Sequence, residues 1–245
     1  QKPRHLPRKS VVEFEPGGPG LGSSRIMIGT AAEALFLRST IPDSTTDFRG
    51  KCLGFWSHLN LLDGIPKVNG SSTLQLREQA EVQDLIYKNE NPEFDSSNLA
   101  DFLAVSHVTS PKNPTEWIER ATAAPWIAID RTPVFLPREQ ILDTIADGKI
   151  DLTTDVILPV EASEAFSVEA PNAAQVTILS FDAHHIAIQT HSEKAAAVVI
   201  AQAHHPAWKA RVNGESARIW RANHAFQAIA VPAGDNTIHL NFRDS

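Results

Sequence analysis

Four residues near the C-terminal end, Arg218, Trp220, Arg221 and His224, carry side chains that can bind a carbohydrate. An indole ring stacks on the apolar face of a sugar, while guanidinium and imidazole groups hydrogen-bond to its hydroxyls. In an alternating strand, Trp220 falls on the same side as Ser216 and Arg218, which is the polar side, so we expect its indole to be exposed. We therefore predict a glycan-binding face here. The competing interpretation is an indole covered by another domain, because large apolar residues are common at domain seams.

Histidines gather in the pairs His184–His185 and His204–His205, with His191 near the first pair. Imidazole is the commonest transition-metal ligand in proteins. Adjacent residues of a strand point to opposite faces, so each pair supplies at most one ligand to a shared site, and carboxylates such as Asp182 would have to complete it. We therefore predict solvated histidines and no metal site.

The sequence lacks the local patterns of the common catalytic and phosphate-binding motifs. A Gly-x-Ser-x-Gly nucleophile elbow is absent, and Cys52, the single cysteine, is predicted to be a small buried residue. The glycine-rich stretch 17–22 contains Pro19 and is not followed by Lys-Ser/Thr, so it is not a phosphate loop. Carboxylates are plentiful, but the sequence identifies no hydrolytic pair. We predict no catalytic residue and no cofactor in this chain.

Charge and hydropathy exclude two classes of function. Lys and Arg number 22 against 29 Asp and Glu, a net charge of -7, whereas a nucleic-acid-binding surface needs clustered positive charge. No apolar run approaches the ~18 residues of a membrane span. The sequence opens with Gln1 and shows no leader, which fits a mature product or a piece of a longer protein; we expect the piece. One cysteine excludes an internal disulfide and leaves the redox compartment open.

The clearest structural pattern follows Asp151, where apolar residues alternate with polar ones in seven short segments. Trp208 shares its side with Ala210 and Val212, so we expect it in the core. Asn213-Gly214 suits a type I′ hairpin turn, and Pro-Ala-Gly-Asp at 232–235 suits a tight reversal. Residues 151–245 are therefore predicted to form an antiparallel β-sandwich, jelly-roll or immunoglobulin-like, with strands at Val176/Ile178, Ile186/Ile188, Val198/Ile200, Trp208–Val212, Ala217/Ile219, Ile229/Val231 and Ile238–Phe242.

Residues 25–150 alternate between helical and extended patterns, which predicts a small α/β domain. Residues 1–24 are rich in Pro and Gly and are predicted to be a flexible arm or linker with a short strand at Val11–Phe14. The chain is thus α+β and multidomain. The expected helices are Ala31–Arg38, Thr73–Lys88 with Thr73 as cap, Ser97–Leu103, Pro114–Thr122 and Arg138–Ala146 closed by Gly148; the expected strands are Arg25–Gly29, Val105–Val108, Trp126–Ile129 and Val134–Leu136; and Ser39–Asp63 is expected to be irregular.

Several segments resemble the C-terminal region of YfhO-like bacterial membrane proteins. Residues 205–214, 221–226 and 231–234 match that family's Tyr-Pro-Gly-Trp-Lys-Ala with its glycine turn, Ala-Asn-Tyr-Ala-Phe and Val-Pro-Ala-Gly elements. Residues 64–70 and 135–138 resemble its pre-helix segment and its Leu-Pro-Arg element. The resemblance covers about Phe55 to Arg243 and is strongest at the end. Ala207 stands where the family usually has Gly, and His224 where it usually has Tyr.

The resemblance implies a location more than a chemistry. Family members are multi-spanning proteins regarded as lipid-phosphosugar-dependent glycosyltransferases. In this class the catalytic acid lies in a loop between early membrane helices, and the soluble C-terminal region lies outside the cytoplasm. We accordingly expect an extracytoplasmic accessory domain, tethered through the membrane domain of the same parent chain, that recognises a glycan or orients a lipid-linked sugar acceptor. The alternative is a structural or protein-interaction module without a small-molecule site. A third hypothesis is a free-standing secreted hydrolase that uses carboxylates of the α/β unit.

Overall fold

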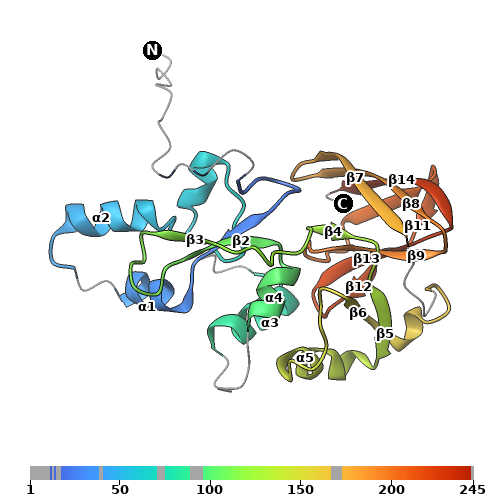
Figure 1. Cartoon of the computed structure of the whole chain (residues 1–245), viewed down its shortest axis with the longest axis horizontal. Coiled ribbons are helices and arrows are strands. Elements are labelled where there is room, and N and C mark those ends of the chain that lie inside the picture. The colour runs from blue at the N-terminus through green and yellow to red at the C-terminus, as the bar shows by residue number, and fades with distance from the viewer. Residues whose placement is uncertain are drawn as a thin grey trace, which may run out of the picture.

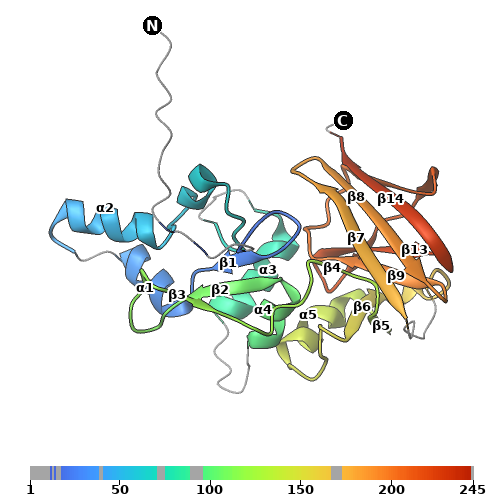
Figure 2. The same cartoon turned by 45° about the horizontal axis from the view of Figure 1, so that its top comes forward.

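The computed structural model describes Val12, Phe14 and residues 18–38, 41–70, 75–88, 96–166 and 173–243. The chain forms two lobes that lie side by side along the long axis of the molecule (Figures 1 and 2). An N-terminal lobe combines helices with a small sheet, and a C-terminal lobe is a β-sandwich. The predicted class, a small α/β part followed by an antiparallel β-sandwich, is confirmed.

The sandwich consists of two antiparallel sheets, ordered β11-β10-β14-β8-β7 and β12-β13-β9-β4. Side chains such as Ile186, Ile188 and Leu240 alternate inward and are completely buried, and Trp208 is buried as expected. The seven strands predicted from alternation are present, although β11 ends before Ile219; β4 lies within the strand predicted at Trp126–Ile129, and β12 is additional. The bounds are β4 Ile127–Ala128, β7 Ala174–Phe181, β8 His185–Ser192, β9 Ala196–Ile200, β10 Trp208–Val212, β11 Glu215–Ala217, β12 Trp220–Ala222, β13 Phe226–Val231 and β14 Gly234–Phe242.

The hairpin between β10 and β11 has the expected turn. Asn213 and Gly214 both have positive φ, 52° and 86°, as a type I′ turn requires. Val212 and Glu215 pair across it. The Asn213 side chain also accepts a hydrogen bond from the backbone N–H of Thr237, which ties the turn to β14.

The N-terminal lobe contains a three-stranded sheet, with β1 parallel to β2 and β2 antiparallel to β3. Its helices pack around this sheet (Figure 1). The α4 and β2 predictions are confirmed within a residue or two. The bounds are β1 Arg25–Met27, α1 Thr30–Arg38, α2 Ser44–Leu53, the 3-10 helix η1 Leu59–Asp63, α3 Arg77–Tyr87, α4 Ser97–Phe102, β2 Val105–Thr109 and β3 Trp117–Glu119.

Two predictions for this lobe are wrong. The helix expected at Pro114–Thr122 is the strand β3, because the side chain of Asn113 accepts hydrogen bonds from Thr115 in a tight turn that brings the chain back along β2. The segment expected to be irregular contains α2, whose start is capped by Asp43 accepting from the backbone N–H of Thr46 at 2.8 Å. The Thr73 cap lies outside the described residues, and α3 begins at Arg77.

Between the lobes in sequence lies a β-α-β unit that packs on the sandwich. The strands β5, Thr132–Leu136, and β6, Asp155–Pro159, are parallel and joined by α5, Arg138–Ala146; the 3-10 helix η2, Val160–Ala162, follows. Both α5 and the αL glycine Gly148 (φ 66°) are as predicted. The predicted domain boundary at Ile150 falls inside this unit. Within the described residues, no helix has the length and apolar character needed to cross a membrane.

Candidate functional site

A cleft of about 500 Å³ opens where the two lobes meet. One side comes from the N-terminal lobe, including the loop after η1 and helix α3. The other side comes from the sandwich, including the end of β7 with the turn after it and the segment after β9. Cavities of this size at domain junctions are where small ligands usually bind in proteins.

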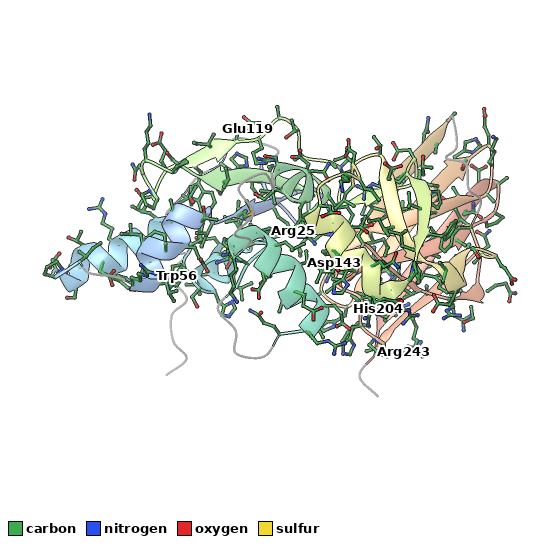
Figure 3. The ribbon with its side chains drawn as sticks, turned by 90° about the horizontal axis from the view of Figure 1, so that it is seen from below. Arg25, Trp56, Glu119, Asp143, His204 and Arg243 are labelled. Atoms are coloured by element: carbon green, nitrogen blue, oxygen red, sulfur yellow. The ribbon has the colours of Figure 1, made fainter. Side chains whose placement is uncertain are left out.

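The floor of the cleft is fixed by Arg25, which lies between the two lobes (Figure 3). Its guanidinium donates to the carbonyl oxygens of Leu103 at 2.8 Å and Ala201 at 2.5 Å, one on each lobe. Its Cζ lies 3.4 Å from the centre of the Trp126 ring. Burial lowers the pKa of Arg25 to about 9. The cation is therefore engaged by backbone and indole, and it works as a cross-link between the lobes.

Lys67 has a similar structural role on the N-terminal side. Its Nζ donates to the carbonyls of Phe55 and Ser57 at 2.7 and 2.5 Å. Phe55 and Ser57 both have positive φ, 47° and 59°, which is unusual for residues other than glycine. Burial lowers the pKa of Lys67 to about 7. The lysine thus holds a strained loop that forms one edge of the cleft.

Amide side chains are the distinguishing feature of the cleft wall. The Gln83 amide donates to the carbonyl of Val68 at 2.9 Å, and Asn69 Oδ1 accepts from the backbone N–H of Ile28 at 3.4 Å. Among the described residues, none bonds to the side chains of Gln75 and Gln79. Each amide offers both a donor and an acceptor. The amides that line the cleft are Asn60, Asn69, Gln75, Gln79, Gln83 and Gln202.

Two buried polar atoms of cleft residues lack a partner in the part of the chain that the structure describes. They are the indole Nε1 of Trp126 and the amide Oδ1 of Asn60. Both residues are almost completely buried. A buried polar group without a hydrogen bond costs about 1–3 kcal/mol, and both atoms lie beneath the surface of the cleft wall.

Two glycines allow the close approaches that shape the cleft. A Cβ on Gly70 would lie 2.8 Å from Cε1 of His58, which also lines the cleft. A Cβ on Gly22, whose φ is 80°, would lie 3.0 Å from the Cβ of Phe181. Gly22 follows Leu21, and Leu21 and Phe181 both line the cleft. The N-terminal turn therefore packs directly on the sandwich.

The prediction that the Trp220 side chain is exposed is wrong. The Trp220 side chain is 8% exposed, because the Arg218 guanidinium covers its ring at 3.7 Å and Phe166 packs edge-on at 6.3 Å between ring centres. The alternation of inward and outward side chains gave the wrong side for Trp220 because Ile219 lies between two strands. The alternation therefore does not continue from β11 into β12. Trp220 therefore offers no stacking surface for a sugar.

Arg221 and His224 instead pair with the N-terminal lobe. Arg221 Nη1 lies 2.5 Å from Glu78 Oε1, and His224 Nε2 lies 2.6 Å from Glu81 Oε2. A hydrogen bond from its own backbone N–H, aided by Arg221, lowers the pKa of the Glu78 carboxyl to about 2. A second cavity of about 280 Å³ lies here, and its lining includes Arg77, Glu78, Arg138, Glu139, Arg221 and His224.

The histidines face carboxylates and rings at the sandwich surface. His191 Nδ1 lies 2.7 Å from Asp235, and the Asp182 carboxylate accepts from the backbone N–H groups of His184 and His185. Because backbone donors bind that carboxylate, its pKa is lowered. In the described ranges, no group of three or more His, Cys, Asp or Glu is placed to hold a metal ion.

Sequence reasoning missed the cleft, although one signal was present. Gln75, Gln79 and Gln83 recur every four residues, and Gln79 and Gln83 therefore share a face of α3. Their convergence with Gln202 and Trp126 depends on the packing of the two lobes, which the sequence pattern does not give.

Comparison with known proteins yields no match: no family model, curated protein or solved structure is significantly similar to this chain. The resemblance to YfhO-like proteins stays a prediction from the residues quoted above.

Proposed function

We propose that this chain binds a neutral, polyhydroxylated ligand, a glycan, in the cleft between its lobes. The observation that carries the proposal is the group of amide side chains that lines one cavity together with the partly exposed ring of Phe181. Sugar hydroxyls both donate and accept hydrogen bonds, as amides do, and the apolar faces of sugar rings pack on aromatic side chains.

The charges of the cleft favour a neutral ligand. Arg25 and Lys67 already donate to backbone carbonyls, and Asp182, at the rim, already accepts from two backbone N–H groups. An ion pair with a charged ligand would have to compete with these bonds. The amides of Gln75 and Gln79 have no such competitor among the residues that the structure describes.

The resemblance to YfhO-like proteins supports a wider context for this binding. In it, the chain is an extracytoplasmic accessory domain of a membrane glycosyltransferase-like protein, and the cleft presents a glycan or a lipid-linked sugar acceptor to the membrane domain of the same parent chain. The role proposed for this region is recognition, with catalysis elsewhere in the parent protein.

The test is a bacterial glycan array probed with the purified chain and with Gln79→Ala. Gln79 is a partly exposed residue of α3, and alanine is the best helix former, so the substitution removes the amide while preserving the helix. We expect specific signals from the native protein that fall about tenfold in Gln79→Ala, in line with the loss of one to two ligand hydrogen bonds.

The matched control is Gln140→Ala, which removes an exposed glutamine from helix α5, outside the cleft. It should bind like the native protein. A folded native protein that gives a blank array contradicts the proposal, and so does equal binding by native protein and Gln79→Ala.

The structure also offers an observation that favours the alternative of a protein-interaction module. Helices α1 and α2, at the end of the N-terminal lobe distant from the sandwich (Figure 1), expose Leu37 at 68% and Phe48 at 66%. Exposed large apolar side chains on neighbouring elements are typical of protein interfaces. If this alternative holds, Leu37→Ser with Phe48→Ser abolishes capture of the membrane domain of the parent chain, while the Gln79→Ala protein captures it normally.

A further inference from the structure

Helix α3 presents two neighbouring faces to two different surroundings. Gln79, Val82 and Gln83 lie on the face that lines the cleft. Glu78 and Glu81 lie on the adjacent face, one turn apart; Glu78 meets Arg221 of β12, and Glu81 meets His224 in the turn between β12 and β13. The same helix is therefore both a wall of the candidate site and a point of attachment to the sandwich.

The attachment consists of an arginine–carboxylate ion pair and a histidine–carboxylate contact, which bridge distant parts of the chain. Arg221 reaches Glu78 and His224 reaches Glu81, and each pair spans 143 positions in sequence. We name these four residues the α3 latch. His224 and Glu81 are joined by a short contact of 2.6 Å, and the His224 side chain is only 17% exposed, so the pair is shielded from water on one side.

The sandwich half of the latch is itself held in place. Asn223, between the two basic residues, is completely buried and has a positive φ of 44°. Its backbone N–H donates to the Ile157 carbonyl at 2.8 Å, and its Oδ1 accepts from the Ile157 N–H at 2.7 Å. These two hydrogen bonds to β6 hold the turn in place, so the latch connects α3 to β6 through this turn.

We propose that Arg221 and His224 are positioning residues for glycan binding: they hold α3 against the sandwich through Glu78 and Glu81, and thereby set the distance between Gln79 on one wall and Gln202 on the other. This inference rests on the proposed function. It assigns to two residues predicted to contact the glycan a role that acts through the helix instead.

The test compares Arg221→Gln and His224→Asn with the native chain. Asparagine accepts the positive φ of 68° at position 224 but is too short to reach Glu81, so the turn is preserved while the contact is lost. Arg221→Lys restores a cation at position 221. The matched control is Lys88→Gln, which breaks an ion pair with Asp84 inside α3 that does not reach the sandwich.

Two measurements are made on each protein: amide hydrogen exchange of residues 77–87, without ligand, and affinity for a glycan selected on the array. We expect Arg221→Gln with His224→Asn to speed exchange in α3 about tenfold and to weaken glycan binding by a similar factor, with strands β8 and β14 unchanged. Arg221→Lys in place of Arg221→Gln should recover part of both losses. Lys88→Gln should change neither.

Unchanged exchange in α3 overturns the latch. Faster exchange with native glycan affinity overturns the positioning role alone. A native protein that binds no glycan overturns the proposed function, and the positioning role with it, while the exchange measurement still reports separately whether α3 is held by these contacts.

Discussion

The sandwich and the far end of the N-terminal lobe differ in how they bury apolar side chains. The sandwich shares one continuous cluster with the β-α-β unit and with helices α3 and α4 of the other lobe. The N-terminal lobe also has, in the part of the chain that the structure describes, two small separate clusters, one around Ile26, Phe55 and Ile65 and one around Ile28, Ala32 and Phe36. The far end of this lobe exposes Leu37 and Phe48.

The comparison shows how the cleft is built from unequal walls. On the sandwich side, Trp126, Ala201 and Phe226 are buried and belong to the large cluster. On the N-terminal side, the loop that carries His58 and Asn69 is held by Lys67 and by the Gly70 contact, and α3 is held by the latch. Apolar packing fixes the sandwich wall, whereas the N-terminal wall combines these polar contacts with the apolar contacts of Val68 and Val82, which belong to the same large cluster.

The largest effect that sharpens this comparison is expected for Trp220→Ala. It removes a large, buried side chain from the continuous cluster and should lower the free energy of unfolding by about 3–5 kcal/mol. Trp56→Ala removes a half-buried ring at the edge of a small cluster and should cost about 1–2 kcal/mol. Urea unfolding followed by circular dichroism measures both.

Equal losses for the two substitutions would contradict the contrast between the regions. A Trp220→Ala protein as stable as the native chain would show that the indole is not part of the core and is exposed at the surface.

A smaller effect is expected in the pH dependence of the free energy of unfolding, and its source is Lys67 on the N-terminal wall of the cleft. Burial lowers the pKa of Lys67 from 10.5 to about 7 in the folded chain. Between these values the unfolded state binds more protons, so stability should rise as pH increases above 7, by at most about 1.4 kcal/mol per pH unit. Lys67→Met should flatten this rise in urea unfolding at pH 6.5, 7.5 and 8.5.

The control for this titration is Lys209→Gln, an exposed lysine on β10. It should retain the native slope. A Lys67→Met protein with the native slope would show that another group causes the pH dependence and that Lys67 does not hold the strained loop as a buried amine.

The sequence predicts the sandwich well because alternation and turn chemistry are local. Asn213-Gly214 specifies its own turn, and the inward side chains follow every second residue along β8 and β14. The helix α5 follows from its apolar spacing and Gly148 for the same reason. Local patterns failed where a tertiary partner decides: β3 extends because β2 offers it an edge, which the residues 114–122 do not reveal.

The candidate site was predictable only in part. Arg221 and His224 stood out by residue type, and the structure places them together, but against Glu78 and Glu81, which lie 143 positions away. The exposure of Trp220 depends on Arg218, which covers its ring. The alternation of side chains along a strand does not predict this contact. The cleft needs both lobes, so the spacing of Gln75, Gln79 and Gln83 in one half of the sequence is not enough to predict it.

The most direct test of the central claim is the location of a bound glycan, measured as protection from amide hydrogen exchange when an array-selected glycan is added to the native chain. We expect protection on both walls, in residues 58–70 and 75–83 and in residues 181–183 and 201–203. Protection confined to the outer face of the β10-β14-β8 sheet, or to residues 218–224, would contradict a binding site between the lobes.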